Sequence, residues 1–228
     1  MQGVLGQALN SLLQGTAVTV EVTVLAAAVA LAVAFAAGLC RLSRNILIRG
    51  GAAVYVEVLR GTSALVVMFW MYFALPFLGV QLTALQAGVL ALGLSYGAYG
   101  AEVVRGAIRQ VPRSQWEGAL ALNMTAAQRM VRVILPQAVI AMLPPMGNLV
   151  VDLLKATSLV SLITLSDLTF HGRLLQNSIG RPTEIFLAVL AVYFVMSYTL
   201  TLGVRRLEGR FSRGMDIGRR AAVRVTVT

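Results

Sequence analysis

The chain alternates between long apolar stretches and short charged segments. A helix needs about 20 mostly apolar residues to cross the hydrocarbon core of a bilayer, and five stretches reach that length. No linker rich in proline or serine separates them, so the pattern predicts an all-α membrane protein with five transmembrane helices in one domain, residues 1–228. The predicted spans lie near Gln14–Leu39, Tyr55–Leu78, Leu82–Ile108, Val131–Leu154 and Thr183–Val204.

Composition supports a membrane location. Of the 228 residues, 58% are hydrophobic and only 12% are charged, and the mean hydropathy is +0.80. A soluble domain of this length cannot bury so much apolar surface, which indicates a multi-pass protein of the cell membrane in contact with lipid. The single cysteine, Cys40, excludes an internal disulfide. Because His171 is also the single histidine, no metal site is expected.

The formal net charge of +10 is distributed in a way that argues against a nucleic-acid partner. Of the 19 lysines and arginines, 16 fall on alternate connections of the predicted spans. Positive charge favours the cytoplasmic side, so the amino terminus is expected outside and the basic tail, residues 206–228, in the cytoplasm. The 16 residues are Arg41, Arg44, Arg49, Arg60, Arg105, Arg109, Arg113, Arg129, Arg132, Arg205, Arg206, Arg210, Arg213, Arg219, Arg220 and Arg224.

Carboxylates in the second and third spans each precede an arginine by three residues. Side chains at this spacing meet on one face of a helix, so Glu57 and Arg60 are expected to form an ion pair. Glu102 and Arg105 repeat the spacing.

In the first span, Glu21 lies among Thr16, Thr19 and Thr23, which favours an interfacial segment whose hydroxyls bond back to the helix. The alternative is an intramembrane carboxylate, which is a functional candidate by default.

The third span is rich in glycine. Gly93, Gly97 and Gly100 recur at spacings of four and three, which lets another helix approach closely. The same stretch carries Tyr96 and Tyr99. We therefore expect one closely packed face and one polar face on this helix.

The fourth span carries a polar stripe. Beyond Pro144 and Pro145, the residues Asn148, Asp152 and Lys155 follow at spacings of four and three, and Lys155 is the only lysine. An acid and a base at membrane depth are costly, which suggests a path for a polar solute. A structural ion pair between the acid and the base explains the stripe equally well.

The segment 112–136 interrupts the apolar pattern with charge. Pro112 is expected to end the third helix. The S-x-x-E pattern at Ser114–Glu117 fits a capping box that starts a short helix over Gln115–Leu122. Asn123 tolerates the left-handed conformation that ends a helix, and the T-x-x-Q pattern at Thr125–Gln128 starts another. Such a short helix fits the groove of a partner protein, or alternatively lies on the membrane as an amphipathic loop helix.

This segment resembles the EAA loop of permease subunits of ABC importers, whose pattern is E-A-A, three residues, G, nine residues and I-x-L-P. The matching stretch is "EGALALNMTAAQRMVRVILPQA". "YVEVLRGTSALV", "GAYGAEVVRGAI" and "LLKATSLVSLITLSDL" are similar to further segments of the polar amino acid branch, which includes importers of histidine, glutamine and arginine. The residues matched to the coupling motif are Glu117, Gly118, Ala119, Asn123 and Pro136.

The resemblance implies the MetI-like type I ABC importer permease fold with a cytoplasmic EAA coupling helix. It implies pairing with a second permease copy or a sister permease, with cytoplasmic ABC ATPase subunits that bind the ATP, and with an extracytoplasmic solute-binding protein. The chain itself is then a transport subunit with no catalytic residue and no cofactor. The resemblance and the polar stripe together suggest a path for the solute. The residues of this path are Tyr96, Tyr99, Glu102, Asn148, Asp152, Lys155 and Ser158.

Several positions depart from the family pattern. Gly118 replaces the second residue of E-A-A, Asn123 replaces a glycine, Ser63 replaces a proline, and Ala156 replaces an aspartate beside the implied solute path. The combination of "ALNM", "GAYGAEVVRGAI" and "LPPMGN" is most similar to permeases for ectoine and hydroxyectoine, which are cyclic zwitterions. The alternative function is an autonomous channel or ion-coupled carrier. A membrane-embedded enzyme is a third and poorer reading, since a single histidine and a single cysteine would leave it only serine, aspartate or lysine chemistry.

Overall fold

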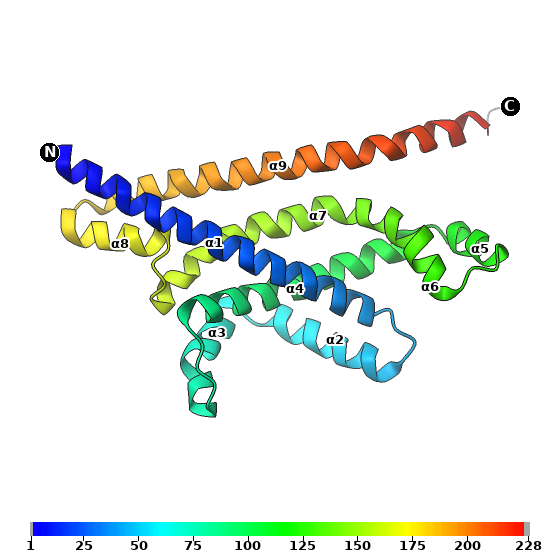
Figure 1. Cartoon of the computed structure of the whole chain (residues 1–228), viewed down its shortest axis with the longest axis horizontal. Helices are drawn as coiled ribbons and strands as arrows, with labels where there is room; N and C mark the ends of the chain where they lie inside the picture. Colours follow the sequence, from blue (N-terminus) through cyan, green and yellow to red (C-terminus); the bar gives the residue numbers. More distant parts are fainter. Residues whose placement is uncertain (1, 226–228) are drawn as a thin grey trace.

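The computed structural model describes the backbone of residues 2–225 and the side chains of residues 7–210, and every regular element in these residues is helical. Four long helices run lengthwise through the molecule, while α5, α6 and the end of α9 lie at one end and α8 lies at the other with the amino terminus (Figure 1). The long helices are α1 (Gln2–Cys40), α4 (Ala84–Gln110), α7 (Leu135–Ala156) and α9 (Pro182–Val225). The shorter helices are α2 (Ile46–Gly61), α3 (Ala64–Phe69), α5 (Arg113–Ala121), α6 (Ala126–Arg129) and α8 (Leu168–Ile179).

The helices confirm the predicted membrane class and correct one span. In the described residues, four helical segments are long and apolar enough to cross a bilayer, and a bent pair brings the number of possible spans to five. The prediction of one continuous span over Tyr55–Leu78 is wrong, because the chain bends by 103° between α2 and the helical segment Ala64–Leu78. Thr62 is in an extended conformation, and its hydroxyl donates a hydrogen bond back to the carbonyl of Val58 at 2.8 Å. The break coincides with the run R-G-T-S at residues 60–63, which the apolar length of the predicted span outweighed.

The predicted basic tail continues α9 as a helix to Val225. The side chains of Arg205, Arg206 and Arg210 belong to the described part of the chain. The side chains of the remaining tail arginines, and residues 226–228 altogether, lie outside it. Up to Val225, the predicted basic tail is therefore a helical extension of the last span.

Close contact between α1 and α4 forms the centre of the bundle. Three glycines of α4 face α1, and a Cβ atom added to one of them, Gly97, would lie 2.8 Å from the Cβ of Val33. A Cβ added to Gly93 or Gly100 would lie 2.6 Å from Val29 or 2.7 Å from Ala34. The expected approach of another helix to this face is confirmed, and α1 is that helix. Small side chains let the two backbones pack without the voids that would cost dispersion energy.

A buried polar cluster fastens α8 to α1 and α9. The side chain of Asp167 is fully buried, caps α8 by accepting a hydrogen bond from the amide of Phe170 at 2.9 Å, and accepts another from the hydroxyl of Tyr193 at 3.3 Å. The hydroxyl of Thr19, on α1, accepts from the amide of Leu168 at 3.1 Å. Thr19 also donates back to its own helix, as do Thr16 and Thr23. The sequence analysis did not predict α8.

We expect Gly97→Ala to destabilise the protein although alanine is the better helix former. The added methyl overlaps Val33, and overpacking of this kind costs about 1–3 kcal/mol. Gly106→Ala is the matched control, because it lies on the same helix with no atom within 4 Å of the added Cβ. It should leave stability unchanged or raise it by up to about 1 kcal/mol. The measurement is thermal unfolding of both variants in detergent, and equal midpoints would contradict the packing argument.

We expect the stability of the protein to fall as the pH rises because of Asp167, which lies in the turn between the described apolar spans. Burial raises the pKa of this carboxyl, although hydrogen bonds from Phe170, Thr169 and Tyr193 oppose the shift. The folded state therefore holds the proton more tightly than the unfolded chain, whose pKa is about 3.9. The stabilisation that this proton gives is complete below the pKa of the unfolded chain. It is lost as the pH rises through the pKa of Asp167 in the folded state.

The matched variant is Asp167→Asn, which keeps an oxygen acceptor for the cap but does not titrate. Thermal midpoints measured from about pH 4 upward should decline more for the wild type than for this variant. Parallel profiles would show that the carboxyl of Asp167 titrates as it does in the unfolded chain.

Candidate functional site

The short helix α5 begins where the third span ends, as predicted, but not by the predicted capping box. Pro112 precedes the helix with φ −54° and ψ 141°, and no side chain caps it. The helix starts at Arg113, so Ser114 is already inside the first turn, and the predicted box between Ser114 and Glu117 is wrong. Proline at the N-cap position has no side-chain oxygen to accept a hydrogen bond from the first-turn amides, which is why no side-chain cap forms.

The predicted turn after α5 is confirmed. Asn123 has φ +55°, its amide bonds to the carbonyl of Leu120 at 2.9 Å, and the amide of Met124 bonds to the carbonyl of Ala119 at 3.2 Å. These two bonds form the Schellman motif that ends a helix with one left-handed residue. The predicted capping box of Thr125 with Gln128 is present and starts α6. A π-helical turn at Met130–Ile134 then leads into α7.

The helix α5 is anchored on one face and free on the other. Ala119 is buried, and Trp116 packs on a hydrophobic cluster that contains Ile134. The amide of Gln137, on α7, donates a hydrogen bond to the side chain of Gln115 at 3.3 Å. On the opposite face Glu117 is exposed, and exposed apolar area is limited mainly to leucines at the carboxyl end of the helix. This arrangement presents a carboxylate and small residues on a rigid support.

The polar stripe on α7 is exposed and is joined to α4. Lys155 and Asp152 form an ion pair at 3.2 Å, with side chains 59% and 57% exposed. The hydroxyl of Tyr96 donates to the backbone carbonyl of Asp152 at 3.2 Å, and that of Ser158 donates to the carbonyl of Lys155 at 2.9 Å. Asn148 is exposed on the same helix. The structural ion pair is therefore real, and contact of these residues with a solute stays a prediction.

Glu102 belongs to a charge cluster at the α1–α2 connection. Its carboxylate pairs with Arg41 at 2.6 Å and with Arg105, the partner that the spacing predicted. Helical spacing could not predict the pairing with Arg41, because Arg41 and Glu102 are 61 positions apart. Two guanidinium groups already satisfy the carboxylate of Glu102 in this structure. Contact of Glu102 with a solute stays a prediction.

The predicted ion pair between Glu57 and Arg60 is wrong for the side chains that the structure describes. Arg60 instead lies over the ring of Tyr99, with its guanidinium carbon 5.5 Å from the ring centroid. The hydroxyl of Tyr99 donates to the backbone carbonyl of Arg60 at 3.2 Å. Tyr99 is thus brought to α2, while Tyr96 is brought to α7. Arg60 was not among the predicted site residues, although its position in an apolar span was the available signal.

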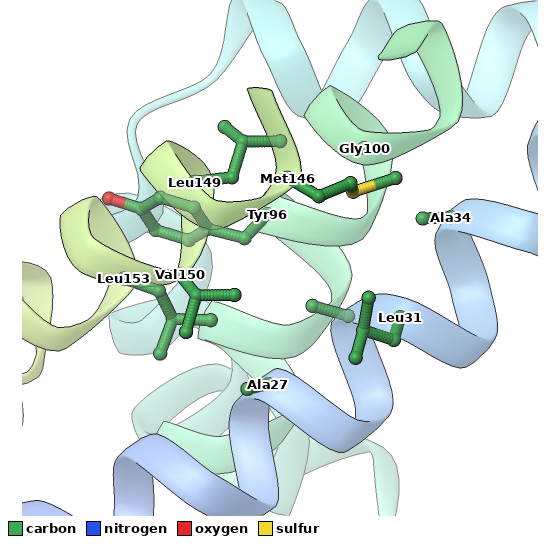
Figure 2. Close-up of a pocket in the computed structure, with 10 residues that line it drawn as sticks. Ala27, Leu31, Ala34, Tyr96, Gly100, Met146, Leu149, Val150 and Leu153 are labelled. Atoms are coloured by element: carbon green, nitrogen blue, oxygen red, sulfur yellow. The ribbon is translucent and has the colours of Figure 1, made fainter. Parts of the chain in front are cut away.

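An apolar cavity lies behind Tyr96, between α1, α4 and α7. It is narrow, with a volume of only about 10 Å³, and Figure 2 shows Tyr96 between the ribbons of α4 and α7, with Met146 and Leu31 on either side of the space. Its further lining is aliphatic or glycine. A polar solute would lose its hydrogen bonds there, so the polar surface on α4 and α7 is the better candidate path.

Comparison with known proteins gives a consistent result. Residues 28–213 match the family described as "Binding-protein-dependent transport system inner membrane component". The probable amino-acid ABC transporter permease protein y4tF of Sinorhizobium fredii is 44% identical over 90% of this chain and 89% of its own length. The glutamine transport system permease protein GlnP of Escherichia coli is 34% identical over 89% and 94% of the two chains.

Solved structures agree. The crystal structure of an amino acid ABC transporter with histidines matches with a TM-score of 0.85 and 33% identity, over 90% of this chain and 96% of that one. An inward-facing structure of the MetNI methionine ABC transporter matches with a TM-score of 0.77 at 19% identity, over 88% and 96% of the two chains, and supports the fold alone.

We expect the turn after α5 to depend on the left-handed residue. Asn123→Ala places a residue with a Cβ and no local hydrogen bond at φ +55°, which costs about 1–2 kcal/mol. Asn123→Gly is the matched control and should be tolerated. Hydrogen exchange of the amides of Asn123 and Met124 should quicken in the alanine variant only. Equal exchange in both variants would contradict the assignment of the Schellman motif.

Proposed function

The chain belongs to the binding-protein-dependent transport system inner membrane component family, and we propose that the solute it passes as the permease subunit of an ABC importer is a polar amino acid or a related zwitterion. The single observation that carries the solute class is the similarity to amino-acid permeases over nine tenths of the chain. The protein is a multi-pass component of the inner membrane. A cyclic zwitterion such as ectoine is the narrower proposal, based on the sequence segments described above.

The end of the bundle that carries α5 is proposed to face the cytoplasm. Arg41 directly follows α1, and Arg105 and Arg109 lie in the last two turns of α4. The carboxyl-terminal ends of α1, α4 and α9 all point toward this end of the bundle (Figure 1). Positive charge concentrates on the cytoplasmic side of membrane proteins. The amino terminus and α8 then face outward, toward the solute-binding protein.

The helix α5 is proposed to be the contact with the ATPase subunit. Its exposed face carries Glu117 and Gly118, and nothing lies within 4 Å of a Cβ added to Gly118, so a cleft on a partner could enclose this face. The opposite face is tied to α7 through Gln115 and Gln137. A displacement of α5 by the ATPase would thus be passed to α7. ATP is bound and hydrolysed by the partner, and this chain supplies neither a catalytic residue nor a cofactor site.

The solute path is proposed to follow the exposed stripe of α7 and the tyrosines of α4. Asp152 and Lys155 lie at the end of a membrane helix with more than half of each side chain exposed in the single chain. Charged groups of this kind are costly against lipid. A second permease, either another copy or a sister subunit, would cover the stripe and enclose the path. An autonomous carrier has no specific support, because it would leave the exposed face of α5 without a purpose.

We expect Glu117→Arg to abolish uptake while the permease still assembles with its ATPase. The reversed charge removes the carboxylate from the exposed face of α5 without touching its buried face. In proteoliposomes that contain the whole complex and the binding protein, uptake should fall by about 100-fold, as expected for loss of an interfacial ion pair of several kcal/mol. ATP hydrolysis should continue without stimulation by loaded binding protein.

Two controls accompany this experiment, one for the charge of residue 117 and one for the need for the ATPase. Glu117→Gln keeps the size of the side chain and removes only its charge, so it should be intermediate. Omission of the ATPase from wild-type proteoliposomes should abolish uptake. Normal uptake by the arginine variant would refute the coupling role, and uptake without the ATPase would establish the autonomous carrier instead.

A further inference from the structure

An exposed arginine, Arg60, lies at the break between α2 and α3, just before the apolar sequence of α3. Arg60 occupies the last turn of α2, about 21 Å along the helix from Ile46 at 1.5 Å per residue. The two helical segments meet there at 103°, and Thr62 and Ser63 between them are extended. Discontinuous helices in membrane transporters are tolerated where the freed backbone lines a cavity or a path for solute.

Arg60 has no carboxylate partner among the side chains of residues 7–210. The nearest predicted acid, Glu57, forms no ion pair with it in this part of the chain. Glu102 is within electrostatic range of Arg60, but its carboxylate is already bonded by Arg41 and Arg105. One glutamate therefore faces three guanidinium groups, and the excess positive charge remains at Arg60.

Tyr99 fixes the position of this charge. The guanidinium lies over the ring at 5.5 Å, and the hydroxyl of the ring bonds to the carbonyl of Arg60 itself. A cation–π contact engages none of the N–H donors of a guanidinium, which leaves its donor edge available. That edge can form two parallel hydrogen bonds to a carboxylate, which is the strongest pairing open to an arginine.

Arg60 is continuous with the polar stripe of α7 through the tyrosines of α4. The rings of Tyr99 and Tyr96 are 6.2 Å apart, and the hydroxyl of Tyr96 reaches the carbonyl of Asp152. Asp152 pairs with Lys155. A single surface thus runs from a free cation on α2, over two aromatic rings, to an acid–base pair on α7. A zwitterion has the complementary chemistry, with a carboxylate for the free cation and a cationic group for the ring faces and Asp152.

We propose that Arg60, held over Tyr99, binds the carboxylate of the transported solute. This inference rests on the proposed function and adds to it the residue that requires the solute to be an acid. It places one end of the solute on α2 and the other toward α7. The class of ligand is a small zwitterion with a free carboxylate.

The test is direct binding to the purified permease–ATPase complex in nanodiscs, without the binding protein. Labelled L-glutamine, L-histidine, L-arginine and ectoine are the probes, and the best-bound of them is carried forward. Arg60→Gln should weaken its binding by about 10- to 100-fold, the loss expected for a bidentate charge-assisted pair. Arg60→Lys keeps the charge but not the fork, so it should lie between the two. Arg173→Gln is the matched control, because it removes an exposed arginine of α8 outside this surface.

The α-amide of the bound amino acid separates a carboxylate contact from a general structural effect. The wild-type complex should bind the amide about as weakly as Arg60→Gln binds the acid, and Arg60→Gln should not weaken amide binding further. Equal wild-type affinity for acid and amide, or unchanged acid affinity in Arg60→Gln, would overturn the proposal. The wild-type comparison decides the matter even where the glutamine variant does not assemble.

Failure of the proposed function has a different signature. A wild-type complex that binds none of the four probes would contradict the solute class, and the carboxylate site would fall with it. Binding by the wild type that is undiminished in Arg60→Gln would leave the solute class intact and reject Arg60 alone.

Discussion

Backbone-close packing of α4 against α1 is the constraint on which the arrangement of polar groups depends. Gly93, Gly97 and Gly100 give α4 a face with no side chains, and α1 fills that face with valines and alanines. Tyr96 and Tyr99 each precede one of these glycines by one position, about 100° around the helix. Because the glycine face is fixed against α1, the tyrosines must point away from it, toward α7 and α2. The ion pair of Glu102 with Arg41 joins the same two helices.

The sequence predicted the features that depend on local chemistry or on helical spacing. The apolar lengths located the long spans, the glycine spacing identified the face that another helix approaches, and Asn123 and Thr125 marked the turn before α6. Predictions failed where two local signals competed. Pro112 occupies the N-cap position of α5, so Ser114 falls inside the helix and does not cap it. In the second span, the apolar length outweighed the polar run at residues 60–63, where the helix breaks.

Contacts between distant positions could not be found by spacing at all. Arg60 has an acid three residues away on its own helix, yet it packs on a ring 39 positions later in the chain. Asp167 similarly acquires its partner Tyr193 only when α8 folds between α1 and α9. In both cases a polar group in an apolar stretch signalled that a partner was needed, because an unpaired polar group is costly there. The identity of the partner depends on tertiary packing, which the spacing does not encode.

The two halves of the polar surface are attached to different parts of the molecule. Asp152 and Lys155 lie on α7, which is bonded to α5 through Gln137. Arg60 lies on α2, which contacts α1 and α4 and has no described bond to α5. A displacement of α5 would therefore move the acid–base pair relative to Arg60, across the tyrosines of α4. A zwitterion that needs both ends of this surface would be held in one state and released in the other. Differential affinity between two states is what a transport cycle requires of its solute site.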